Sequence, residues 1–236
     1  MELLDTTREA FRLLFSADPV LWGIVWVSVK VSLLALILVG PLAVAAGFVL
    51  AHVAFPGRRL LVILVQALQS FPTVVVGLLL YMLLSRQGPL GSLQLLFTQT
   101  AMILGQMAIA FPVLAAYTLS AVQGADPRAH ETARSLGAGR MRAALTLLWE
   151  VRFGAMAGVF MGFGRVISEI GCALMVGGNI AGLTRNIPTA IALETGKGEF
   201  AQGVALGIVL IVLALGVNIA LAALQGEGGM KRSWQP

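Results

Sequence analysis

Charged side chains are scarce in this sequence. Only 11% of its 236 residues are Asp, Glu, Lys or Arg, whereas 58% are hydrophobic and the mean hydropathy is +0.90. A soluble domain usually has about 25% charged residues. The composition therefore excludes an ordinary soluble domain and indicates an integral membrane protein. The formal net charge of +5 is more typical of basic cytoplasmic loops in such a protein than of nucleic-acid binding.

Residues for covalent or metal chemistry are also few. Cys172 is the single cysteine, which excludes an internal disulfide and any cysteine-based metal site. His52 and His130 lie far apart in the sequence, which argues against a histidine metal cluster. We therefore expect no metal site, no bound cofactor and no catalytic residues, and a membrane-embedded enzyme is a poor alternative.

A phosphate-binding loop is missing as well. Such a loop needs G-x-x-x-x-G-K-[ST], whose amides and lysine hold the phosphates of a nucleotide. The single Gly-Lys pair lies in ETGKGE, residues 194–199, where Gly198 replaces the Ser or Thr and the earlier glycine is absent. We expect that this chain does not hydrolyse ATP itself.

Long apolar segments dominate what is present. A helix that crosses a hydrocarbon core of about 30 Å needs about 20 residues. Five segments meet this length, and we predict an all-α integral membrane protein with five transmembrane helices within residues 20–224. The predicted spans are 20–52, 60–84, 97–121, 153–177 and 200–224. Pro41, Pro72 and Pro112 lie inside three of them, and each should kink or locally open its helix. They are either ordinary membrane-helix prolines, or Pro72 and Pro112 shape a pathway between helices.

The N-terminal residues 1–19 do not have the long apolar stretch of a cleavable signal. One helical face roughly gathers Leu3, Leu4, Thr7, Phe11, Leu14 and Phe15. This pattern predicts an amphipathic helix at the outer membrane surface, and the alternative is a frayed tail.

The distribution of Lys and Arg predicts the orientation. The loops 53–59 and 122–152 and the tail 225–236 carry nine basic residues, whereas the opposite side carries five. The first group is Arg58, Arg59, Arg128, Arg134, Arg140, Arg142, Arg152, Lys231 and Arg232. The second group is Arg8, Arg12, Arg86, Arg185 and Lys197. The richer side should be cytoplasmic, which places the N-terminus outside and the C-terminal tail inside a multi-pass protein of the cell (inner) membrane.

The loop 122–152 has its own helical pattern. Asp126 and Pro127 are typical of a helix start, and the helix should run to about Leu136. Gly137 and Gly139 permit a turn with positive φ, after which a second helix from about Arg140 leads into the fourth span. The pattern predicts either a rigid helix–turn–helix elbow or a solvated basic loop that only sets the topology.

The fourth predicted span contains two charged residues one helical turn apart. Arg165 lies 13 residues beyond Arg152, or about 20 Å along a helix. Arg165 and Glu169 either form a neutralised pair that joins helices, or Arg165 sets the field for an anion while Glu169 holds a gate closed. Gly154, Gly158 and Gly162 allow close helix packing, against either the chain's own bundle or a second copy.

The loop 177–199 is rich in glycine and in hydrogen-bond donors. Asn186 could cap a short helix over about 188–195, with Gly196 after its end. The N–H groups at the start of that helix would favour an anion, and the alternative is a structured outer loop that only contacts a partner.

The stretch ETARSLGAG, residues 131–139, resembles the EAA loop of ABC-transporter permease subunits. Glu131, Ala133 and Gly137 match that motif, whereas Thr132 replaces its central Ala. Trp149 and Glu150 stand where the family often has a Leu-x-Pro ending. The resemblance implies a coupling helix that docks on a separate ATPase subunit, which uses ATP and Mg. The implied coupling residues are Arg128, Glu131, Thr132, Ala133, Arg134 and Gly137.

Residues 168–200, SEIGCALMVGGNIAGLTRNIPTAIALETGKGEF, resemble permeases of the tungstate ABC importers, and molybdate permeases have a looser version. This resemblance implies a type I importer permease that works as a homodimer with ATPase subunits and an extracytoplasmic oxyanion-binding protein. It also implies an outer gate loop at 177–199. The pathway or gate candidates are Pro72, Pro112, Arg165, Ser168, Glu169, Asn179, Thr184 and Arg185. The alternatives are a molybdate or broader oxyanion permease, and then a motor-free secondary transporter or channel.

Overall fold

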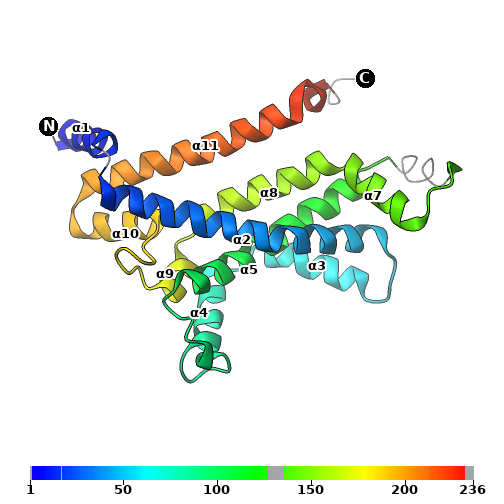
Figure 1. Ribbon diagram of the computed structural model, residues 1–236, viewed down its shortest axis with the longest axis horizontal. Helices are drawn as coiled ribbons and strands as arrows, with labels where there is room; N and C mark the ends of the chain where they lie inside the picture. The colour runs from blue at the N-terminus through cyan, green and yellow to red at the C-terminus, as the bar shows by residue number, and fades with distance from the viewer. Residues whose placement is uncertain (1, 17, 127–134, 232–236) are drawn as a thin grey trace. The chain divides into compact units, whose positions relative to one another are not determined.

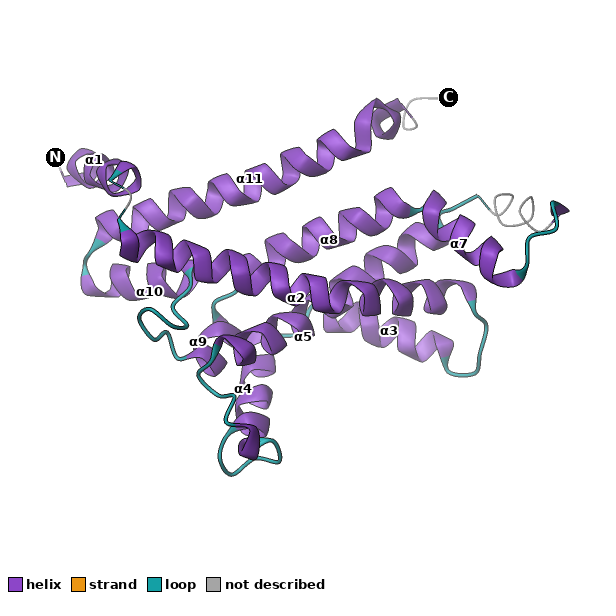
Figure 2. Ribbon diagram, viewed as in Figure 1, coloured by secondary structure: helices purple, strands orange, loops and turns teal. Residues whose placement is uncertain are grey.

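The computed structural model describes residues 2–16, 18–126 and 135–231. Its elements are α1 (Glu2–Phe15), α2 (Pro19–His52), α3 (Arg58–Leu68), α4 (Thr73–Leu84), the 3-10 turn η1 (Gly91–Leu93), α5 (Gln99–Gln123), α7 (Arg140–Glu150), α8 (Arg152–Ile167), α9 (Gly171–Gly177), α10 (Ile187–Lys197) and α11 (Phe200–Lys231) (Figure 1). The described residues contain helices and loops and no strand (Figure 2). The all-α prediction is confirmed.

Among the described residues, three helices are long and apolar enough to cross a membrane: α2, α5 and the part of α11 from Phe200 to Leu224. Two pairs of consecutive helices, α3 with α4 and α7 with α8, reach this length only together, each across a short break. The count is therefore three spans, or five if each pair forms one span. The second predicted span, 60–84, is not one continuous helix.

Pro72 explains the break in the second predicted span. Its ring removes the backbone N–H, so the helix cannot continue through it with full hydrogen bonding. Pro72 instead lies at the N-cap of α4, and its carbonyl accepts hydrogen bonds from the N–H groups of Val75 at 2.9 Å and Val76 at 3.3 Å. Pro112 behaves differently, because α5 continues through it.

The chain divides into two compact units. Unit 1 consists of Met1–Leu38, Phe71–Ala110 and Phe163–Gly216, and unit 2 consists of Val39–Ser70, Phe111–Gly162 and Val217–Pro236.

The core of unit 1 joins α1, α2, α10 and α11, which lie together in Figure 1. Its buried side chains are Ala10, Leu21, Ile24, Val25, Ile187, Ala190, Ala205 and Leu206. Helix α1 packs on this core through Ala10, Leu13 and Leu14. Phe11 and Phe15 point elsewhere, because they stack on each other and stay 45% and 85% exposed. The predicted N-terminal helix is present, but its packed face is shifted from the face that the sequence indicated.

In unit 2, α8 packs closely on α5. A Cβ atom at Gly154 would lie 2.5 Å from Cβ of Ala121, and one at Gly158 would lie 2.7 Å from Cβ of Tyr117. Real side chains do not approach so closely, so glycine is required at both positions. These two glycines therefore pack against the chain's own bundle rather than being free for a second copy.

Candidate functional site

A break between α8 and α9 interrupts the fourth predicted span. Helix α8 ends at Ile167, and Ser168, Glu169 and Ile170 separate it from Gly171, where α9 begins. The prediction of one helix over 153–177 is wrong here. Ser168 is exposed, and its hydroxyl donates to the carbonyl of Gly164 at 2.8 Å.

Glu169 occupies the centre of this break. Its side chain is 3% exposed, whereas the side chain of Arg165 is 42% exposed. One carboxylate oxygen accepts a hydrogen bond from the N–H of Cys172 at 3.1 Å, and the other lies 3.7 Å from Nη1 of Arg165. A buried carboxylate requires such partners, because desolvation otherwise makes the charged form very costly. The predicted Arg165–Glu169 pair is present, and Glu169 also holds the start of α9.

Gln106 of α5 ties this region to a second helix. Its amide nitrogen donates to the carbonyl of Val166 at 3.3 Å, one turn before Glu169. The side chain is 3% exposed, and its oxygen has no hydrogen-bond partner among the described residues. As a polar residue inside a predicted span, Gln106 is expected either to line a pathway or to bond between helices. Its hydrogen bond to Val166 fits the second alternative.

Helix α9 fits tightly between its neighbours α4 and α5. A Cβ atom at Gly77 would lie 2.8 Å from Cα of Cys172, and one at Gly105 would lie 2.5 Å from Sγ of Cys172. At the other end of the contact, Gly171 meets Val74 in the first turn of α4, which follows Pro72. The start of α4 after Pro72 is thus brought against the start of α9 after Glu169.

The loop after α9 is held by its own polar side chains. The hydroxyl of Thr184 donates to the carbonyl of Gly177 and accepts from the N–H of Ile180 at 3.0 Å. Asn179 has a φ of 51° and donates to the carbonyl of Thr189 at 3.4 Å. Nη1 of Arg185 lies 3.7 Å from the buried carboxylate of Glu194 on α10. In this structure Asn179, Thr184 and Arg185 stabilise the loop and its junction with α10, and their role in a pathway stays a prediction.

Helix α10 confirms the short helix predicted after Asn186. Asn186 and Thr189 form a capping box, with the side chain of Asn186 accepting from the N–H of Thr189 at 3.1 Å. The helix runs from Ile187 to Lys197, and its C-cap is Gly198 with a φ of 85°. The prediction that Gly196 follows the helix end is therefore wrong.

The N–H groups at the start of α10 are already occupied. The N–H of Ile187 donates to the hydroxyl of Ser28 at 2.6 Å, Pro188 has no N–H, and the N–H of Thr189 donates to Asn186. The expectation that this helix start is open to an anion is wrong, because the capping box and Ser28 satisfy these donors.

The elbow of unit 2 is described only in part. Arg128, Glu131, Thr132, Ala133 and Arg134, and nearly all of the first predicted helix, lie outside the described residues. Gly137 has a φ of 85°, as the predicted turn requires, whereas Gly139 is extended with a φ of −63°. Helix α7 then begins at Arg140, and α8 follows at an angle of 62°. The second helix of the predicted elbow is confirmed.

No group of three or more His, Cys, Asp or Glu side chains is placed to hold a metal ion within residues 2–16, 18–126 and 135–231. The polar contacts around Glu169 join α8, α9 and α5. The polar side chains of the loop after α9 instead contact Gly177 and α10. The arrangement provides helix breaks, internal caps and the half-exposed side chain of Arg165.

Comparison with known proteins agrees with this architecture. Residues 43–226 match the family described as binding-protein-dependent transport system inner membrane component. The chain is 38% identical over 216 residues to a tungstate uptake system permease protein of Campylobacter jejuni, covering 92% of this chain and 90% of that protein. It is 36% identical over 220 residues to a tungstate uptake system permease protein of Peptoclostridium acidaminophilum, covering 93% and 96%. It is 30% identical over 218 residues to the molybdenum transport system permease protein of Escherichia coli, covering 87% and 95%.

The match to the family covers most of the chain, including α5, α7, α8, α9, α10 and most of α11. The chain belongs to the family of inner membrane components of binding-protein-dependent transport systems, the permease subunits of ABC transporters.

Proposed function

We propose that this chain is the permease subunit of an ATP-driven tungstate importer. The observation that carries the proposal is the similarity to two tungstate uptake permeases, at 38% and 36% identity over 92% and 93% of this chain. The molybdenum permease of Escherichia coli is less similar, at 30% identity. Tungstate and molybdate are both oxyanions, so molybdate is the second candidate substrate.

The predicted orientation, with the N-terminus outside, rests on the distribution of Lys and Arg. The segments assigned to the cytoplasm carry nine of these residues and the segments assigned to the outside carry five.

We further propose a homodimer with two ATPase subunits bound in the cytoplasm and an oxyanion-binding protein outside. The coupling residues would lie within the elbow 122–152. A single residue, Val151, separates α7 from α8, and its side chain packs with Val122 and Leu147. A displacement of the elbow is therefore transmitted to α8, which leads to the break at Ser168.

The break after α8 would then act as the gate. Glu169 restrains the start of α9 and neutralises Arg165 in the present conformation. If the two side chains separate, the half-exposed Arg165 is the group that attracts an oxyanion, whereas an uncompensated Glu169 would repel it. The loop of Asn179, Thr184 and Arg185 belongs to the same outer region under the proposed topology.

Uptake by proteoliposomes tests the proposed substrate. The full complex of permease, ATPase and binding protein would be supplied with tungstate and an excess of molybdate or sulfate as competitor. Tungstate uptake that resists both competitors supports the proposal. Equal competition by molybdate contradicts tungstate selectivity and favours a permease for both oxyanions, and no tungstate uptake contradicts the proposal.

A further inference from the structure

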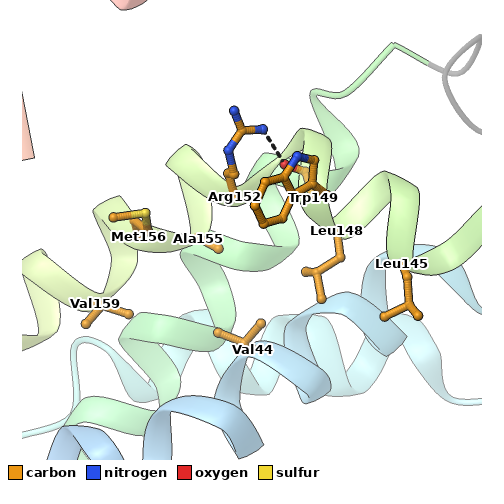
Figure 3. A pocket seen from close by; sticks show the side chains of 8 residues that line it. All are labelled: Val44, Leu145, Leu148, Trp149, Arg152, Ala155, Met156 and Val159. Carbon is orange, nitrogen blue, oxygen red and sulfur yellow. Dashed lines mark hydrogen bonds between the residues drawn. The ribbon is translucent and has the colours of Figure 1, made fainter. Parts of the chain in front are cut away.

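An apolar groove opens beside the α7–α8 elbow in unit 2 (Figure 3). It has a volume of about 430 Å³. Seven of its eight lining residues are apolar: Val44, Leu145, Leu148, Trp149, Ala155, Met156 and Val159. Figure 3 shows these side chains converging from α2, α7 and α8. The volume is in the range of small-molecule pockets, which are about 300–1,000 Å³.

The eighth lining residue, Arg152, gives the groove a cationic rim. Its guanidinium carbon lies 4.8 Å from the ring centre of Trp149 and 4.3 Å from that of Phe153. Nη1 donates to the carbonyl of Trp149 at 2.7 Å, as the dashed line in Figure 3 shows. This is the one hydrogen bond that the described residues give to Arg152, and a guanidinium has five N–H donors. The side chain is thus held at the rim with donors available for an anion.

We propose that this groove binds one acyl chain of an anionic phospholipid, with the lipid phosphate at Arg152. An apolar groove with an arginine in its lining has the two-part chemistry of such a lipid, and basic pockets between helices are known to hold anionic head groups. From Arg152 to Val159 the groove follows about 10 Å of helix, enough for a large part of an acyl chain.

The surroundings favour a lipid over a protein segment. Trp149 is 70% exposed and Leu145 is 57% exposed, in a chain whose helices cross a membrane. Tryptophan and arginine together are typical of the membrane interface. The proposed ATPase site is the preceding segment, 127–137, so the lipid site adds to the proposed function and does not depend on which oxyanion is carried.

Quenching of Trp149 by brominated lipids tests the proposal. In a variant with Trp22, Trp26 and Trp234 replaced by phenylalanine, Trp149 is the remaining tryptophan. The full chain would be reconstituted into vesicles of phosphatidylglycerol and phosphatidylcholine, with bromine on the acyl chains of either lipid in turn. We expect binding near Trp149 to favour phosphatidylglycerol about fivefold, the effect of one interfacial basic residue.

Two kinds of variant separate the site from general charge. Arg152→Gln should lower the ratio of phosphatidylglycerol to phosphatidylcholine binding near Trp149 to about one. Arg142→Gln removes a charge on α7 outside the groove lining and should leave this ratio unchanged. Val44→Phe should lower quenching by both lipids, because it fills the groove from α2.

A preference near one in the parent chain would overturn the proposal. An equal loss in Arg142→Gln would also overturn it, since the preference would then reflect the net charge of the elbow. Weak quenching by both lipids at every lipid content would show that a second copy or another protein covers the groove. Protection of Trp149 from quenching by added ATPase would show that the ATPase covers it. Either result would contradict the lipid site.

Discussion

Replacing Glu169 by glutamine or by alanine separates its two contacts. Glutamine keeps an oxygen that can accept the hydrogen bond from the N–H of Cys172, which is 3.1 Å long in the parent chain, but it removes the charge 3.7 Å from Arg165. Alanine removes both contacts.

The loss of the ion pair and the loss of the hydrogen bond should lower the stability by different amounts, because Arg165 is half-exposed whereas the N–H of Cys172 is buried. The side chain of Arg165 is 42% exposed, so water screens its attraction to Glu169, and the pair should contribute no more than about 1 kcal/mol. The N–H of Cys172 is buried, and leaving it without an acceptor costs about 1–3 kcal/mol. We expect Glu169→Gln to lower the stability by about 1 kcal/mol and Glu169→Ala by about 2–4 kcal/mol.

Thermal unfolding of the purified chain in detergent measures the difference. For a protein of this length, 1 kcal/mol corresponds to about 2–4 °C in Tm, so alanine should lower Tm at least about twice as far as glutamine. Ser168→Ala is the control, because Ser168 is exposed and its hydroxyl bonds only to carbonyls of α8. Equal shifts for glutamine and alanine would refute the reasoning, because the bond to Cys172 would then carry no stability.

Three further predictions follow from close contacts. Gly105→Ala should destabilise the chain by about 1–3 kcal/mol through overlap with Sγ of Cys172, and adding Cys172→Ala should restore most of the loss in Tm; no recovery would contradict the contact. Ser28→Ala should lower the stability by about 1–3 kcal/mol, because it leaves the N–H of Ile187 unpaired. The control Ser32→Ala should be nearly neutral, since the buried hydroxyl of Ser32 has no partner among the described residues. Equal Tm values for the two variants would contradict this. In the full complex, Glu169→Gln should raise ATP-independent leakage of tungstate from loaded proteoliposomes, and unchanged leakage would argue against a gate at Glu169.

Several features were predictable because they depend on local sequence. Apolar runs of about 20 residues located α2, α5 and the part of α11 up to Leu224, and Pro72 marked the helix break before α4. Asn186, Pro188 and Gly137 carry cap and turn signals that act within a few residues, and α10, its cap and the turn before α7 were found accordingly.

Other features depend on contacts between distant residues. The sequence around Ser168 and Glu169 stays apolar enough to look like a continuous span, and the break there depends on the cap from Glu169 and on the packing of α9 against α4 and α5. Ser28 satisfies the N–H of Ile187 from 159 residues away, which no local pattern indicates. The packed face of α1 likewise follows from the core of unit 1 and not from the amphipathic pattern alone.

The most direct test of the account is whether transport depends on a motor bound at the elbow. Tungsten accumulated by proteoliposomes would be measured with and without ATP, for the parent complex, Glu131→Lys and the matched charge change Glu150→Lys at the far end of α7. The account predicts uptake only with ATP, loss of uptake and of ATPase co-purification in Glu131→Lys, and retention of both in Glu150→Lys. Uptake without ATP, or normal uptake in Glu131→Lys, would contradict it and favour a motor-free secondary transporter.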